Sequence, residues 1–176
     1  MKRIMILLSC MMLFTCSSGL NAQIKIGKAG KVAASVKTSY VANPSSILTT
    51  TENWRRTVSK TILLNPTDSG EVYLLSLDTF STLDKPMTVY LGNTDESALL
   101  SLQDIEGLLH EENDSTFEIP IIGGVATVSV NNKSMQNRFY NALTIISEDY
   151  IGEVRMTRDE AQKLIKKFEG FLKNKQ

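Results

Sequence analysis

Hydrophobic and polar positions follow two different periods along the chain, and the clearest pattern stands at its C-terminal end. Residues 153–156 favour a short strand, and apolar residues then recur at helical spacing from Ala161 to Leu172. Thr157 and Glu160 stand three residues apart at the start of this stripe, which is the spacing of a capping box. We therefore predict a strand followed by an amphipathic helix whose apolar stripe packs on the rest of the fold.

Alternation of period two dominates the chain before this helix and predicts strands. The predicted strands are Val58–Leu64, Val72–Phe80, Met87–Leu91, Phe117–Ile122, Val125–Val130, Phe139–Ile146 and Glu153–Met156. A middle helix is predicted where Asn93 or Thr94 caps an apolar stripe from Ala98 to Leu109. The fold class is therefore α+β, a mostly antiparallel sheet of about six strands with both helices packed on it. The sequence pattern predicts no internal repeat.

Turn-forming residues give the connections between these strands. Gly123-Gly124 predicts a hairpin with a two-residue primed turn, and residues 131–134 predict another turn. Pro120 cannot donate a ladder hydrogen bond, so its strand is expected at a sheet edge or with that side facing outward. Residues 43–51 are expected to break the preceding chain and continue as a polar loop.

The N-terminus predicts export from the cytoplasm. Lys2 and Arg3 precede an apolar run from Ile4 to Phe14, which is typical of a bacterial secretory signal peptide with cleavage after Ala22. In the alternative, Cys16 ends a degenerate lipobox and carries a lipid anchor, although Thr15 departs from the usual small residue before such a cysteine. The expected location is therefore the periplasm or the exterior, with membrane attachment only in the lipidated form.

The predicted organisation is a signal peptide (1–22), a polar N-terminal segment or tether (23–52) and a single α+β domain (53–176). Both cysteines, Cys10 and Cys16, fall in the signal peptide. The exported chain then has no thiol for a disulfide or for thiolate chemistry, so its stability must come from its core. No segment after the signal is apolar and long enough to suggest a transmembrane helix.

Charge is unevenly distributed along the predicted mature chain. Residues 23–60 carry a local charge of +6, residues 61–118 a charge of −11, and residues 119–176 a charge of +3. An acidic face that attracts a basic partner is one interpretation, and a self-complementary arrangement between molecules is another. The alternative is that the three blocks fold over one another and their fields largely cancel. Basic residues are not interleaved with aromatic residues, so we expect no nucleic-acid partner.

Candidate chemistry is sparse. His110 is the single histidine, and its neighbours Glu111, Glu112 and Asp114 lack the alternating ligands and glycine of a calcium loop. The carboxylates considered for hydrolysis are spread along the chain: Asp78, Asp84, Glu106 and Glu118. Their separations, which decide such chemistry, do not follow from sequence.

Other chemical signatures are weak or incomplete. Gly123-Gly124 lies between two strands and is no phosphate loop, and Ser45, Ser59 and Ser76 lack the glycines of a nucleophile elbow. Trp54 is either an aromatic anchor for a partner or an edge of the core. We therefore assign no catalytic, cofactor-binding or metal-binding residue and expect no cofactor.

The leading hypothesis is a small exported, non-enzymatic module of the cell envelope that binds an unidentified protein or small molecule. A hydrolase that uses only carboxylates is the first alternative, and it requires two acids that converge in a pocket. The second alternative is a structural or assembly subunit, which an open strand edge or a lipid on Cys16 would favour.

Overall fold

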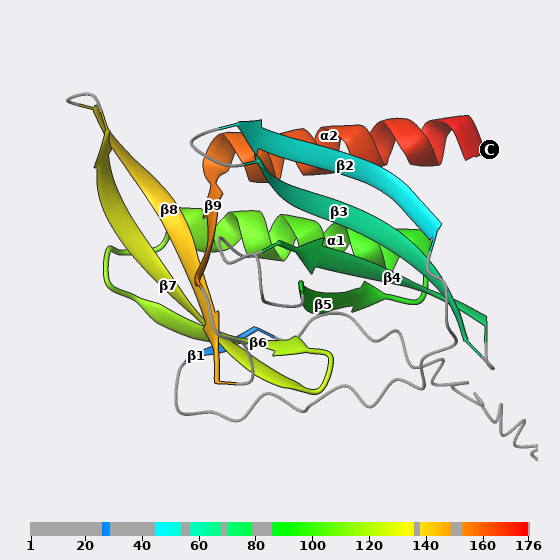
Figure 1. Ribbon diagram of the computed structural model, residues 1–176, viewed down its shortest axis with the longest axis horizontal. Helices are drawn as coiled ribbons and strands as arrows, with labels where there is room; N and C mark the ends of the chain where they lie inside the picture. The colour runs from blue at the N-terminus through cyan, green and yellow to red at the C-terminus, as the bar shows by residue number, and fades with distance from the viewer. Residues whose placement is uncertain are drawn as a thin grey trace, which may run out of the picture.

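The computed structural model describes residues 26–28, 45–53, 57–67, 70–78, 86–135, 138–148 and 153–175 (Figure 1). The strands are β1 (Gly27–Lys28), β2 (Ser45–Asn53), β3 (Thr57–Thr67), β4 (Gly70–Leu77), β5 (Met87–Gly92), β6 (Thr116–Ile121), β7 (Gly124–Met135), β8 (Arg138–Ser147) and β9 (Glu153–Thr157). The helices are α1 (Asp95–Gly107), the short 3₁₀ helix η1 (Leu108–His110) and α2 (Arg158–Lys175). The predicted signal peptide, with Cys16 and Ala22, lies outside the described residues, as do Trp54 and Asp84.

One antiparallel sheet contains all the strands. Eight strands lie side by side in chain order from β2 to β9, and the short β1 pairs with β6. From β2 to β9, each strand pairs with the next one in the chain. β5 and β6 also pair, although α1 and η1 are inserted between them. The α+β class is thus confirmed, but the sheet has more strands than the predicted number of about six.

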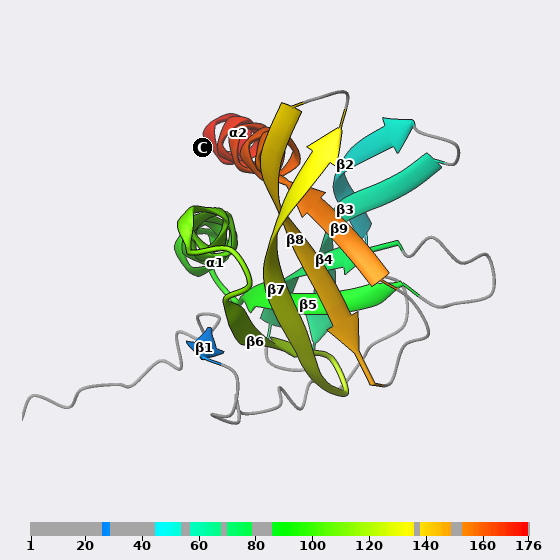
Figure 2. The same cartoon turned by 90° about the vertical axis from the view of Figure 1, so that its left-hand side faces the viewer.

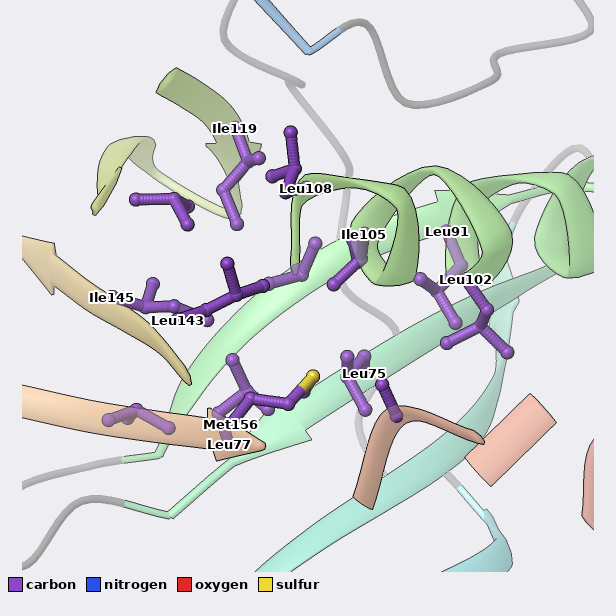
Figure 3. Close-up of a cluster of buried hydrophobic side chains, with 14 of the residues drawn as sticks. Leu75, Leu77, Leu91, Leu102, Ile105, Leu108, Ile119, Leu143, Ile145 and Met156 are labelled. Carbon is purple, nitrogen blue, oxygen red and sulfur yellow. The ribbon is translucent and has the colours of Figure 1, made fainter. Parts of the chain in front are cut away.

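Both helices lie on the same side of the sheet (Figure 2). Alternate strand residues face them and form one apolar core, together with Ala98, Leu102 and Ile105 of α1 and with Ala161, Leu164 and Phe168 of α2. Figure 3 shows side chains of β4, β6, β8, β9 and α1 meeting in this core. Burial of this apolar surface is the main force that holds the helices on the sheet.

The order of elements occurs twice. Strands β2 to β5 are followed by α1, and strands β6 to β9 are followed by α2. The two helices are antiparallel, since Asp95 at the start of α1 contacts Lys175 at the end of α2, while Glu106 near the end of α1 contacts Arg158. The chain therefore contains two four-strand-plus-helix halves, a repeat that we did not recognise in the sequence.

Two segments that were expected to be loops are strands. β2 occupies Ser45–Asn53, which falls in the segment 23–52 predicted as a polar tether except for its last residue, and it pairs with β3. Its three consecutive threonines have a high strand propensity, which outweighs their polarity. β7 continues through the turn predicted at residues 131–134 and ends only at Met135. In that part of the strand, pairing with β8 overrides the turn propensity of Asn131 and Asn132.

The β6–β7 hairpin forms, but its turn is not of the predicted type, and one of the two alternatives for Pro120 is excluded. Ile121 pairs with Gly124, so the turn residues are Ile122 and Gly123, and of these only Gly123 has a positive φ. Both primed turns require a positive φ at the first turn residue, so this turn is of neither primed type. Pro120 is not on an edge strand, because β6 lies between β5 and β7. Along β6, Phe117 and Glu118 pair with β1, and Ile121 pairs with β5. Pro120 lies between them and has no pairing partner on that side among the described residues, so the ladder does not need the N–H that proline lacks.

Candidate functional site

The start of α1 is fixed by its own first turn. Thr94 and Ser97 form a reciprocal capping box, and Asp95 and Glu96 follow at the positive end of the helix dipole. One turn later, the buried hydroxyl of Ser101 donates a 2.6 Å hydrogen bond to the carbonyl of Leu91 in β5. This bond gives the hydroxyl a partner inside the core and fastens the buried side of α1 to the strand before it.

Exposed carboxylates stand at the start of α1 and in the loop after η1. Glu96, Glu111, Glu112 and Asp114 are exposed, and residues 86–132 contain eight acidic residues and no Lys or Arg. We call the exposed carboxylates of Glu96, in the first turn of α1, and of Glu111 and Glu112, in the loop after η1, the α1 acidic surface. Charges of one sign on one element raise the local potential and attract ligands of the opposite sign.

The adjacent helix α2 has the opposite character. Its exposed residues include Lys163, Lys166, Lys167 and Lys173, while Ala161, Leu164 and Phe168 are buried. Lys173 and Lys175 stand in its last turn, where cations complement the helix dipole. The exposed lysines of α2 and the exposed carboxylates beside α1 therefore stand on different elements.

Tyr73 of β4 joins the start of α1 to the end of α2. Its hydroxyl donates a 2.5 Å hydrogen bond to Oδ1 of Asp95 and accepts one of 3.1 Å from Nζ of Lys175. Lys175 also donates to Oδ1 of Asp95 at 3.1 Å. The Tyr73 ring meets Phe168 edge to face at a centroid distance of 5.3 Å. A polar contact at the surface is thus continuous with the apolar core.

These contacts shift three pKa values. The hydrogen bond from Tyr73 lowers the pKa of Asp95, with a smaller lowering by Lys175 and opposition from burial. The hydrogen bonds to Tyr73 and then to Asp95 raise the pKa of Lys175. Burial, followed by the bond to Asp95, raises the pKa of Tyr73. At neutral pH this arrangement favours a neutral phenol between a carboxylate and an ammonium group, which stabilises the fold rather than activating Tyr73 as a base.

Glu106 joins the opposite ends of the same helices. Its Oε1 atom accepts a 3.1 Å hydrogen bond from Gln162 and lies 3.6 Å from Nε of Arg158. Nε2 of His110, one turn further along the chain, lies 3.3 Å from the same oxygen. Glu106, predicted as a candidate hydrolytic acid, is therefore part of the contact between α1 and α2.

A buried ion pair connects the two halves more deeply. Lys60 of β3 is only 1% exposed and its Nζ atom bonds to Oε1 of Glu160 in the first turn of α2. The other carboxylate oxygen of Glu160 accepts hydrogen bonds from the backbone and side chain of Thr157. The predicted capping box therefore forms, and its glutamate also neutralises a buried lysine.

The acids considered for metal binding or hydrolysis do not share a site. In the part of the chain that the structure describes, no three His, Cys, Asp or Glu side chains gather around a metal position. The carboxylate of Asp114 accepts a hydrogen bond from Asn113 in the turn before β6. Glu106 lies on the helix side of the sheet, whereas Glu118 points to the opposite face, since its neighbours Phe117 and Ile119 are in the core.

The remaining candidate side chains have structural positions. The carboxylate of Asp78 accepts a hydrogen bond from the backbone N–H of Ser59, and Ser45 donates to the carbonyl of Leu64. Ser76 lies in β4, paired with Thr61 and Thr88. Lys60 and Tyr73, which hold the two halves together, were not predicted as interacting residues from the sequence. The sequence does contain a signal that Lys60 is buried. Lys60 alternates with Ile62 and Leu64 on the same side of its strand, where an apolar residue is expected.

Comparison with known proteins gives no family for this chain. No protein-family model, no curated protein and no solved structure matches it. Among the described residues, no helix has the length and apolar character needed to cross a membrane.

Proposed function

We propose that this chain is an exported, non-enzymatic binding module of the cell envelope that recognises a basic partner protein through the α1 acidic surface. The observation that carries the proposal is the separation of charge between the two helices, with Glu96, Glu111 and Glu112 exposed on or beside α1. Export remains an inference from the N-terminal sequence, in which Lys2 and Arg3 precede an apolar run.

Contacts at the helix ends support this choice of surface. Asp95 and Glu106 are engaged by Lys175 and Arg158 of α2, so part of the charge of α1 is used within the fold. The α1 acidic surface points to solvent instead, where opposite charges on a partner would raise the rate of encounter and fix orientation. A basic surface on another protein is the partner that this chemistry favours.

Affinity capture from an envelope extract tests the proposal. We expect a stoichiometric partner at low salt that is lost at about 1 M salt, where the Debye length falls to roughly 3 Å. The variant E96Q/E111Q/E112Q should lose this partner. The matched control E71Q/E148Q/E169Q removes three carboxylates from other elements and should retain it. Equal retention by both variants would contradict the proposal.

A further inference from the structure

β2 is the terminal strand of the sheet on one side. It pairs with β3, and among the described residues no strand pairs with its other edge. A bulge near Ile47 interrupts the register, so the regular part of the strand is Leu48–Asn53. Glu52 is the only charged residue of β2. Terminal strands rich in β-formers and poor in charge readily pair with strands of other molecules, and proteins normally protect them.

The protecting charge comes from α2, which lies alongside β2 (Figure 1). Lys167 extends from α2 and its Nζ atom donates a 3.0 Å hydrogen bond to the carbonyl of Thr49. That carbonyl therefore faces outward from the sheet, as in a non-hydrogen-bonded pair of the β2–β3 ladder. The 3.2 Å contact between the hydroxyls of Thr49 and Thr61 agrees with this, since side chains lie closer in such pairs.

The regular part of β2 is suited to pairing with a copy of itself. In an antiparallel pair centred on Thr50, Thr49 stands opposite Thr51 and Leu48 stands opposite Glu52. No like charges face each other in this register, and threonines occupy its centre. An arriving strand would need the Thr49 carbonyl as an acceptor, and Lys167 occupies it.

We propose that Lys167 closes the β2 edge against a second copy of this chain, which would otherwise add its own β2 in antiparallel pairing. The lysine acts in two ways. It takes the acceptor that an added strand requires, and it places a charged ammonium group where that strand would lie.

The experiment measures self-association of the chain by sedimentation velocity over a range of concentrations. Unmodified protein should remain monomeric, and Lys167→Met, which keeps the stem length but removes the charge and the donor, should dimerise at least about tenfold more tightly. Lys166→Met changes the neighbouring exposed lysine and should behave as unmodified protein. Lys167→Arg retains a charged donor and should also remain monomeric.

A second variant identifies the edge. Thr49→Pro, added to Lys167→Met, removes an outward N–H without breaking a bond to β3 and should restore the monomer. A dimer that survives Thr49→Pro would overturn the proposal, because its interface would lie elsewhere. The proposal is also overturned if Lys167→Met associates no more tightly than unmodified protein.

Discussion

The two halves of the molecule share an order of elements but anchor their helices differently. At a constant offset of 63 residues, Thr94 corresponds to Thr157, Ala98 to Ala161 and Ile105 to Phe168. Each pair has the same place in its helix, namely N-terminal cap, first buried turn and deep core. The helices differ at the third position after the cap, where α1 has buried Ser97 and α2 has Glu160, the partner of Lys60.

This difference separates two roles. α2 contacts the first half at Lys60, Tyr73 and Glu106, and so connects the two halves through its first turn, its core face and its last turn. α1 is capped by its own first turn, and exposed carboxylates stand at its start and in the loop after η1. The contacts of α2 mainly serve stability, and we propose the α1 acidic surface as the binding surface.

The largest expected effect is on the free energy of unfolding, and it compares the corresponding core side chains Phe168 of α2 and Ile105 of α1. Phe168→Ala should lower the free energy of unfolding by about 3–5 kcal/mol, because it leaves a cavity and removes the contact with Tyr73. Ile105→Ala, at the corresponding place in α1, should cost less, about 2–3 kcal/mol. Urea unfolding measures both, and Leu100→Ala at an exposed position should change the value by under about 0.5 kcal/mol. A larger cost for Ile105 than for Phe168 would contradict the comparison.

The next effect tests the ion pair between the halves. Glu160→Gln keeps a side chain that can cap Thr157 but leaves Lys60 buried without this carboxylate, so it should cost about 3 kcal/mol. Adding Lys60→Met should recover most of that loss, because the buried charge that lost this carboxylate is removed. Ser97→Ala, at the corresponding place in α1, should cost only about 1 kcal/mol. A similar cost for Ser97 and Glu160 would show that the two caps do not differ.

The smallest effect concerns pH. The pKa of Asp95 is lowered in the folded protein, so its contribution to stability is present above the ordinary carboxylate pKa and is lost as pH falls through the folded value. Asp95 and Lys175 are each 45% exposed, and solvent screening limits the cost of Asp95→Asn at pH 7 to under about 1 kcal/mol. Unfolding measured between pH 7 and 2 should show this cost disappearing in acid. A cost that stays constant with pH would contradict the role of the ionised carboxylate.

Local sequence patterns predicted the helices and strands that are specified by residues within each segment. The helix after Thr157 and the middle helix after Thr94 follow from caps and apolar stripes, and the strands before them follow from alternation. β2 was missed because its polar threonines resemble a loop until β3 supplies a partner. The repeat was missed because the halves share topology and only a few residues. The contact of Lys60 with Glu160 joins residues 100 positions apart, a distance that no local pattern spans.

The most direct test of the central claim compares one surface from each helix in the same capture experiment at low salt. The two variants are E96Q/E111Q/E112Q beside α1 and K163Q/K166Q/K173Q on α2. Each neutralises three exposed charges and leaves the core unchanged. The account predicts that the partner is lost with the α1 variant and retained with the α2 variant. Retention by the α1 variant together with loss by the α2 variant would contradict it and would assign the binding surface to α2.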